Sequence, residues 1–294
     1  MTTTYYFRVA DFCFSVSLPS LCNIDKLLPS FMPFAVADGR GESLLFGFSV
    51  VPSSRMQRFA GGELIEETFN DMGHLSLYRH AGGYYIEIAD GGCRHAMYAT
   101  PDFSSVEASV CWDDRHAGSA VSSLIRVAYA QAILAHAAVS IHASAVCCGG
   151  RAYLFMGKSG TGKSTHSSLW IKNIPGTQLL NDDNPTIRVI DGKTYAYGTP
   201  WSGKTPCYKN KSCPVAGMVR LRQSAQNIFH IQYGADAFVA VYPGCSVIAD
   251  DARLRGMLYD TLAMVAGSVT VGTMECRPDS DAALTCHDAL TKNF

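Results

Sequence analysis

Residues 157–164, with the sequence Gly-Lys-Ser-Gly-Thr-Gly-Lys-Ser, constrain the fold more than any other part of the chain. They fit the pattern G-x-x-x-x-G-K-[ST] and follow the apolar residues 152–156, so they predict a strand, a glycine-rich loop and then a helix. Glycines let successive backbone N–H groups point inward around phosphate oxygens, and the dipole of the following helix adds positive potential there. The motif predicts an α/β domain that binds a nucleoside triphosphate.

The residues of this phosphate loop have expected roles. In loops of this kind the lysine, here Lys163, reaches the β- and γ-phosphates, and the hydroxyl of Ser164 holds a Mg²⁺ ion. ATP and Mg²⁺ are the expected cofactors, although such loops bind phosphates and leave the choice of base to other contacts. The plainer alternative is a glycine-rich turn that only joins a strand to a helix. The expected nucleotide-binding residues are Gly157, Lys158, Ser159, Gly160, Thr161, Gly162, Lys163, Ser164 and Thr165.

The overall charge of the chain argues against two classes of partner. The 294 residues are 48% hydrophobic and 17% charged, with a formal net charge of −1, as in an ordinary globular protein. Such a chain has no global electrostatic attraction to nucleic acid or to an anionic membrane, so neither is an expected partner.

The cysteines and the N-terminus favour the cytoplasm. The eleven cysteines are odd in number, include no C-x-x-C pair and place Cys147 next to Cys148, so we expect reduced, mostly buried thiols. The first residues lack the charged and apolar regions of a secretory signal, and we expect no apolar run long enough to span a bilayer.

Two regions differ in their hydrophobic pattern. The first contains short segments rich in aromatic and β-branched residues, such as 44–51, 74–78, 83–88 and 94–99, which predict antiparallel strands. Helical spacing begins at Val121, Leu124 and Ile125 and continues to Ala135. We therefore expect a β-rich N-terminal domain over residues 1–117 and an α/β (α+β) domain over residues 118–294.

The second region is expected to contain a mixed sheet. A strand at 140–148, a turn at Gly149-Gly150 and a strand at 151–156 lead into the phosphate loop, and a helix follows at 162–172. Asp191-Gly192 predicts a hairpin between strands at 186–190 and 193–197. Further elements are expected in the last part of the chain: a helix capped by Asp250-Asp251, a strand at 269–276 and a helix opened by 278–280.

Two carboxylates follow the next apolar segment. Residues 177–181 approach Asp182-Asp183, about twenty residues after the phosphate loop. Mg²⁺ takes only one or two carboxylates and keeps several waters, so one aspartate suffices to hold it beside the triphosphate. The other can orient an acceptor hydroxyl and take its proton, since a loose transition state requires little proton removal. The alternative is that both are solvated turn residues or helix caps.

Other polar residues are weaker candidates. His142 precedes the phosphate-loop strand and would meet a carboxylate or the metal, although a single histidine among apolar residues is more often a core residue. Lys204, in the loop 199–205, would clamp the transferring phosphate or bind an acidic acceptor, or would be a surface lysine. Arg220 and Arg222 alternate with apolar residues and would face one side of a strand, near the γ-phosphate or in solvent.

Together these motifs resemble the HPr kinase/phosphorylase-like family and its structural relative, ATP-dependent phosphoenolpyruvate carboxykinase. The resemblance covers about residues 138–225, through residues 141–145 around His142, the loop 157–164 and the run 181–183. It implies the P-loop fold of these families, with a mixed sheet, and an ATP-dependent kinase. It also implies that Asp182 is the catalytic carboxylate, close to His142, and that Asp183 lies on the metal side.

Two departures limit what the resemblance implies. The chain is too short for the oxaloacetate-binding domain of the carboxykinases, and residues 200–205 stand where HPr kinases have a glutamate-containing segment. The expected acceptor is therefore a hydroxyl of a small molecule or of a peptide or protein side chain. The alternatives are a nucleotide-binding regulatory module without catalysis and a carboxykinase-like lyase. The β-rich region would recognise the acceptor, cover the site or mediate assembly into a homo-oligomer.

Overall fold

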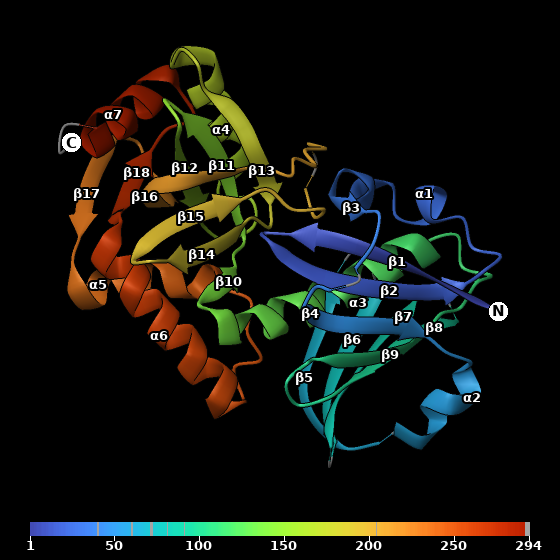
Figure 1. Ribbon diagram of the computed structural model, residues 1–294. Helices are drawn as coiled ribbons and strands as arrows, with labels where there is room; N and C mark the ends of the chain where they lie inside the picture. Colours follow the sequence, from blue (N-terminus) through green and yellow to red (C-terminus); the bar gives the residue numbers. More distant parts are fainter. Residues whose placement is uncertain are drawn as a thin grey trace. The chain divides into compact units, whose positions relative to one another are not determined.

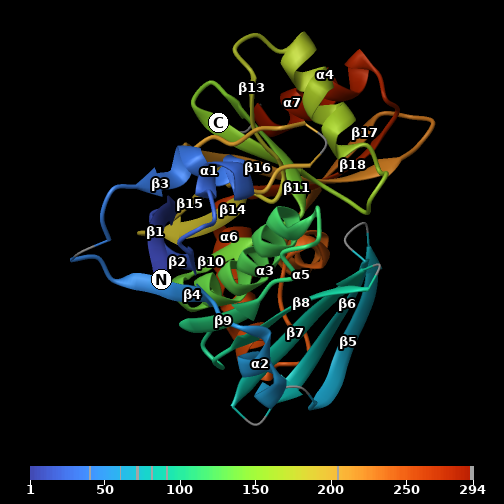
Figure 2. The same ribbon diagram turned by 90° about the vertical axis from the view of Figure 1, so that its right-hand side faces the viewer.

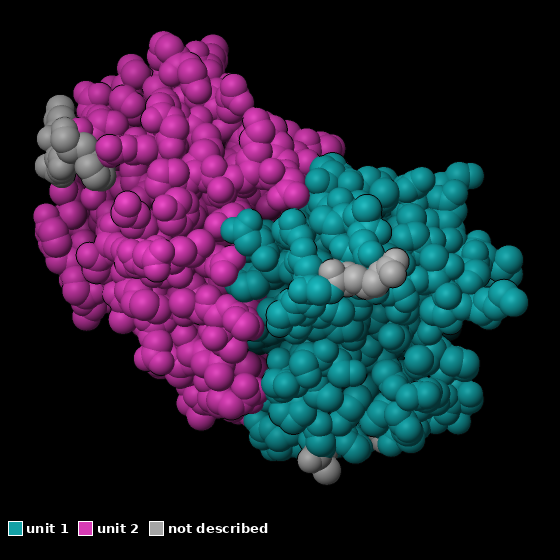
Figure 3. Space-filling view, viewed as in Figure 1, with its two compact units in different colours: residues 1–132 teal, residues 133–294 magenta. Residues whose placement is uncertain are grey.

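The computed structural model describes residues 1–39, 41–59, 61–70, 73–80, 82–90, 92–203 and 205–291. Its contacts divide the chain into two compact units, Met1–Ala132 and Ile133–Phe294, which Figure 3 shows in different colours. Each unit is built on a large mixed β-sheet, so the protein is a mixed α/β protein. Lys204 lies outside the described residues.

The first unit contains a sheet of nine strands, counted over the described residues, in the order β3-β1-β2-β4-β9-β8-β7-β6-β5. Figure 2 shows β5 to β8 side by side in an antiparallel run. The expectation of purely antiparallel pairing is wrong for β4, which pairs in parallel with both β2 and β9. The elements are β1 (Thr2–Val9), β2 (Phe12–Pro19), α1 (Ile24–Leu27), β3 (Ala35–Val36), β4 (Leu44–Val50), α2 (Ser53–Met56), β5 (Glu63–Asn70), β6 (Gly73–His80), β7 (Gly83–Asp90), β8 (Cys93–Ala99), β9 (Ser105–Ser109) and α3 (Ala117–Ala132).

Helix α3 belongs to the first unit. Its buried face, which includes Val121, Leu124 and Ile125, recurs at the spacing of one helix face and packs against β4 and β8. Because α3 packs on this sheet, the division falls after Ala132 and not at the expected boundary between residues 117 and 118.

The segment Ala117–His136, which comprises α3 and the following 3₁₀ turn, is long and apolar enough to cross a bilayer by length and composition alone. The expectation that no segment meets this criterion is therefore wrong. In the structure 67% of the apolar window is buried, as in the core helix of a globular protein.

The second unit also contains nine strands among the described residues. They run in the order β10-β14-β15-β16-β12-β11-β13, with β18 beside β16 and β17 beside β18. Helices α4 and α7 pack together on one side of this sheet, and α5 and α6 pack together on the other (Figure 1). The elements are β10 (Ala138–Ser140), β11 (Ala143–Cys148), β12 (Arg151–Met156), α4 (Lys163–Asn173), β13 (Gln178–Asp183), β14 (Thr186–Ile190), β15 (Lys193–Tyr197), β16 (Ser212–Gln223), β17 (Ile228–Gln232), α5 (Gly234–Val241), α6 (Ala252–Ser268), β18 (Thr270–Cys276) and α7 (Ser280–Thr291).

Several local predictions for this unit are confirmed. Gly149 and Gly150 have positive φ angles and join β11 to β12, which pair in antiparallel fashion. Asp191 and Gly192 also have positive φ angles, 48° and 72°, in the turn between β14 and β15. The carboxylate of Asp251 accepts hydrogen bonds from the first turn of α6 and so caps that helix.

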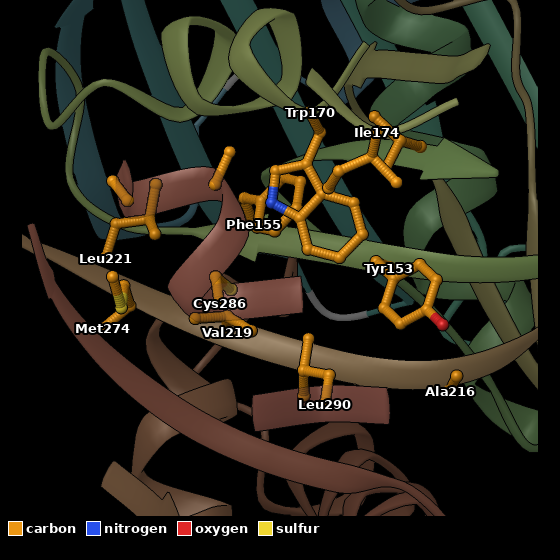
Figure 4. Packing of buried hydrophobic residues seen from close by; sticks show 13 residues of the cluster. Tyr153, Phe155, Trp170, Ile174, Ala216, Val219, Leu221, Met274, Cys286 and Leu290 are labelled. Carbon is orange, nitrogen blue, oxygen red and sulfur yellow. The ribbon is translucent and has the colours of Figure 1, made fainter. Parts of the chain in front are cut away.

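The core beneath the phosphate loop is centred on Trp170 of α4. Figure 4 shows Trp170 beside Phe155 and Tyr153 of β12, and the ring centroids of Trp170 lie 5.2 Å and 4.8 Å from those of the two rings. Leu290 and Cys286 of α7 belong to the same buried cluster. The contacts fix α4 against β12, and so they fix the geometry of the loop that joins them.

The expectation of reduced cysteines is wrong for one pair. Cys147 of β11 and Cys213 of β16 form a disulfide, and their Cα atoms lie 6.7 Å apart. The two residues are 66 positions apart in sequence, so their proximity depends on the sheet and not on a local motif. The nine other cysteines are free, as expected, and lie at buried or partly buried positions.

Candidate functional site

The phosphate loop has the backbone geometry that its glycines allow. Gly157, Gly160 and Gly162 have φ angles of 156°, 76° and 106°, and Gly162 is the N-cap of α4. A Cβ atom on Gly157 would lie only 3.1 Å from the side chain of Thr161, so that position has little room for a side chain. Because Gly162 has no side chain with which to cap α4, the N–H groups of the first turn remain open to an anion.

The sheet brings the phosphate loop and the carboxylates to one edge. Strand β11 lies between β12 and β13, and Ala143 pairs with both Met156 and Asp183. His142 is therefore next to this edge, although it lies between β10 and β11 and not inside a continuous strand as expected. A cavity of about 370 Å³, here called the carboxylate pocket, is lined by His142, Ala143, Ser144, Ser159, Gly160, Gly162, Lys163, Ser164, Thr165, Asp182, Asp183 and Gly203.

Asp182 is held in this pocket by a chain of two serines. Its side chain is buried, and its Oδ1 accepts a hydrogen bond of 2.8 Å from the Ser144 hydroxyl. Since that bond uses the only hydroxyl proton of Ser144, the contact of 2.6 Å between Ser167 and Ser144 must have Ser167 as its donor. Asp182 Oδ2 is buried and has no hydrogen-bond partner within the described parts of the chain. One carboxylate oxygen is thus fixed, and the other has no donor among the described residues.

Asp183 is more exposed and has different neighbours. Its Oδ1 lies 3.4 Å from His142 Nε2, and Asn184 Nδ2 donates to its Oδ2 at 3.1 Å. The Asp183 side chain is 28% exposed, whereas the residue Asp182 is only 4% exposed. The two adjacent carboxylates therefore differ in solvent access, which suits them to different tasks.

Lys163 bends back over the loop from which it extends. Its Nζ donates to the carbonyl oxygen of Gly157 at 3.0 Å and, more weakly, to that of Lys158 at 3.4 Å. Burial lowers the pKa of Lys163, and the charges of Asp183 and Asp182 oppose this effect. The ammonium group is therefore partly desolvated beside two carboxylates, where an added polyphosphate would strengthen its electrostatic interactions.

Asn181, which belongs to the run 181–183 but has no expected role of its own, forms hydrogen bonds that hold the site together. Asn181 is fully buried, and its Oδ1 accepts from the backbone N–H groups of Asp183 and Asn184 at 3.0 and 2.8 Å. Its Nδ2 donates to the carbonyl oxygen of Trp201 at 3.0 Å and to Thr199 Oγ1 at 3.2 Å. A polar residue directly before two aspartates, at the end of an apolar strand, was the available signal.

The loop after β15, which begins at Thr199, contacts the backbone of Asp182 and Asp183. The N–H of Gly203 donates to the carbonyl oxygen of Asp182 at 2.9 Å, and Ser202 forms an antiparallel bridge with Asp183. A Cβ atom on Gly203 would lie 2.6 Å from that carbonyl oxygen, so only glycine fits. This contact brings the loop that begins at Thr199 into the site.

We expect Asn181→Leu to destabilise the protein by about 2–4 kcal/mol, because it leaves several buried backbone groups without partners at nearly constant volume. Asn173→Ala, which removes one hydrogen bond to the Leu169 carbonyl at the end of α4, is the control and should cost about 1 kcal/mol or less. Urea unfolding measures both. Equal losses in the two variants would contradict the organising role of Asn181.

Two further cavities border the phosphate loop. One, of about 540 Å³, is lined by residues 157–161 and 220–223 and includes the expected residues Gly157, Lys158 and Thr161. The other, of about 420 Å³, has an apolar wall that includes Leu169, Leu221, Cys276 and Pro278. His166 also lines the second cavity, and burial lowers its pKa to about 4, so it is neutral at pH 7. The loop thus borders three cavities: one that contains the two aspartates, one whose charged lining residues are basic, and one with an apolar wall.

Most of the expected site residues line the carboxylate pocket. His142, Asp182, Asp183, Lys163 and Ser164 share the carboxylate pocket with Ser159, Gly160, Gly162 and Thr165. The structure describes no group of three or more His, Cys, Asp and Glu side chains, within its described residues, that would hold a metal on its own. Oxygen donors from Ser164 and Asp183 together with nucleotide phosphates fit the way Mg²⁺ binds proteins, through one or two carboxylates and the substrate.

Comparison with known proteins gives a distant structural likeness. No protein-family model matches the chain, and no curated protein matches it. Among solved structures, the Hpr(Ser) kinase/phosphatase from Coxiella burnetii is similar, with a TM-score of 0.30 and 13% sequence identity. The likeness covers 52% of this chain and 94% of that chain. A likeness at this level says nothing about substrate or activity.

Proposed function

We propose that the protein is an ATP- and Mg²⁺-dependent phosphotransferase that acts on a hydroxyl group of a small molecule or of a peptide or protein side chain. The observation that carries this proposal is the carboxylate pocket. It combines a glycine-rich loop, Lys163, Ser164 and two aspartates of different exposure in about 370 Å³. Phosphoryl transfer depends on positioning and charge stabilisation, and these groups supply both.

The nucleotide is proposed to lie along the loop with its base in the apolar cavity. The N–H groups of the loop and of the first turn of α4 would bind the phosphates, and Lys163 would neutralise charge on the β- and γ-phosphates. Thr165 lines both the carboxylate pocket and the apolar cavity, so the two adjoin at the start of α4. A flat purine ring suits the aliphatic wall of Leu169 and Leu221.

The Mg²⁺ ion would be held by the hydroxyl of Ser164 and the carboxylate of Asp183. When bound, it would neutralise charge on the β- and γ-phosphates. The contact of His142 with Asp183 then has a positioning role, because it fixes one carboxylate oxygen while Asn184 fixes the other.

Asp182 is proposed to receive the acceptor. A substrate hydroxyl would donate its hydrogen bond to the unpartnered Oδ2, while Ser144 holds Oδ1 in place. As the acceptor oxygen bonds to the γ-phosphorus, the bond from that phosphorus to the β–γ bridging oxygen breaks. The electron pair of that bond leaves with ADP, and the hydroxyl proton passes to Asp182.

The proposal also includes a type of fold and a cellular compartment. The order of strand, phosphate loop, helix and paired aspartates in a mixed sheet supports a P-loop domain of the HPr kinase C-terminal type. We propose the cytoplasm as the place of the reaction, because ATP is available there. The Cys147–Cys213 disulfide removes the cysteine argument for that compartment.

The test is to measure binding of Mg-ATP and transfer from γ-labelled ATP to mixtures of hydroxyl-bearing small molecules and peptides. We expect binding that requires Mg²⁺ and label that appears on an alcohol oxygen. Binding without transfer to any acceptor would favour a nucleotide-responsive regulatory module. Release of CO₂ from oxaloacetate would favour a lyase, and failure to bind any nucleotide would reject all three functions.

A further inference from the structure

The 540 Å³ cavity on the other side of the phosphate loop is formed by two parallel strands. Strands β12 and β16 are neighbours in the sheet, and Met156 pairs with Arg220. The carboxyl ends of both strands therefore meet at one edge, where β12 continues into residues 157–161 and β16 ends with residues 220–223. Ligands of α/β sheets bind at such carboxyl edges.

The charged side chains that line this cavity are all basic: Lys158, Arg220 and Arg222. We call these three residues the basic cluster. Arg220 Nη1 donates to the carbonyl oxygen of Ala240 at 2.9 Å, which fixes its guanidinium group from α5. Across the described ranges of the chain, neither arginine forms an ion pair with a carboxylate. Glu275 of β18 stands opposite Arg222 in the strand register but does not line the cavity.

The environment of Arg220 shows that this charge is costly to keep. Burial lowers the pKa of Arg220, and the neighbouring charge of Arg222 lowers it further. Two arginines on one face of a strand repel each other in the free protein, and an anion between them would relieve both effects. Guanidinium groups are also the side chains whose planar donors match phosphate and carboxylate oxygens.

The position of the basic cluster indicates which anion it binds. Its cavity shares Ser159 and Gly160 with the carboxylate pocket, so the two cavities lie on either side of one turn of the loop. In the proposed function Lys163, Ser164 and the loop amides bind the triphosphate and its Mg²⁺ ion. A molecule that spans both cavities would have its hydroxyl end at Asp182 and its far end beside the arginines. The cavity volume suits a small molecule.

We propose that Lys158, Arg220 and Arg222 bind an anionic group, a phosphate or a carboxylate, on the small molecule that accepts the phosphoryl group. This inference rests on the phosphotransferase function proposed above. It narrows the acceptor to a hydroxyl compound that carries at least one negative charge. In this arrangement the basic cluster positions the acceptor and takes no part in bond breaking.

The experiment measures anion binding with the nucleotide site filled. The full chain is saturated with Mg²⁺ and a non-hydrolysable ATP analogue, and inorganic phosphate or malonate is then titrated by calorimetry. We expect one anion to bind, and Arg222→Gln to raise its Kd at least about tenfold. Arg151→Gln, the same change of charge at the opposite end of β12, should leave this Kd unchanged. Arg222 is exposed, so the variant should fold with the thermal midpoint of the wild type.

The possible outcomes separate this inference from the proposed function. Phosphate binding without malonate binding assigns a phosphorylated acceptor, and the reverse assigns a carboxylate. A protein that binds the analogue but neither anion overturns the inference alone, as does equal weakening by Arg151→Gln. If Arg222→Gln raises the Kd of the analogue by the same factor, the cluster serves the nucleotide and the inference fails. A protein that binds no analogue overturns the proposed function and with it this extension.

Discussion

Replacing Asp182 by asparagine is expected to lower the rate of phosphoryl transfer by about 10²–10⁴-fold, the range typical of a lost general base. The amide keeps the shape of the side chain and can still accept the hydrogen bond from Ser144 through its oxygen. Its nitrogen then replaces the unpartnered Oδ2, so it donates where the acceptor hydroxyl needs an acceptor. The Kd for Mg-ATP should change little, because the contacts proposed for the triphosphate come from the loop and from Asp183.

Steady-state kinetics with γ-labelled ATP and equilibrium binding of a non-hydrolysable analogue test this prediction together. Asp191→Asn is the matched control, because it makes the same change in an exposed hairpin turn where asparagine before glycine is also favourable. A large loss of nucleotide affinity in Asp182→Asn would place this carboxylate with the phosphates and the metal. Normal transfer in the variant would remove Asp182 from catalysis.

The parts of the site that are local in sequence could be predicted from the sequence. The loop 157–164 has its glycines at positions with positive φ and lies between β12 and α4, as its pattern requires. Asp191-Gly192 and the Asp251 cap are similar cases, because a few adjacent residues determine each turn or helix end. Local backbone chemistry of this kind does not depend on how the rest of the chain packs.

The partners of the carboxylates could not be predicted, because they come from distant parts of the chain. Ser144 of β11 donates to Asp182, and Ser167 of α4 contacts Ser144, but nothing in the residues around either serine marks it as part of an aspartate network. Asn181 is adjacent to the aspartates, yet its bonds to Thr199 and Trp201 cross between segments about twenty residues apart. These contacts follow from strand order, which hydrophobic periodicity does not specify.

The same reason explains the errors in the larger organisation. Periodicity predicts α3 but does not say which sheet its apolar face covers, and the contacts group this helix with the first unit. The parallel pairing of β4 and the Cys147–Cys213 disulfide also depend on which strands become neighbours. Alternation in a short strand indicates one buried face and does not identify the strands that become its neighbours.

Lys163→Ala is expected to weaken both ATP binding and transfer, in contrast to Asp182→Asn. Removal of a charge-assisted hydrogen bond to phosphate costs about 1.5–3 kcal/mol, which is about 10- to 150-fold in Kd. Transfer at saturating ATP should also fall by about 10²–10³-fold, because the ammonium stabilises charge on the phosphates in the transition state. Isothermal titration with Mg-ATP and γ-labelled transfer assays measure the two effects.

Stability separates this functional loss from misfolding. The ammonium of Lys163 is partly desolvated, and its hydrogen bonds go only to loop carbonyls, so its removal should leave the free energy of unfolding unchanged or slightly higher. Lys172→Ala, at the exposed end of the same helix, should alter neither binding nor transfer. If Lys163→Ala retained wild-type affinity for ATP, the loop would not hold the triphosphate as proposed. If Lys163→Ala lost ATP binding because it no longer folds, the lysine would be needed for stability. Comparison of Lys163→Ala with Asp182→Asn would then no longer distinguish binding from catalysis.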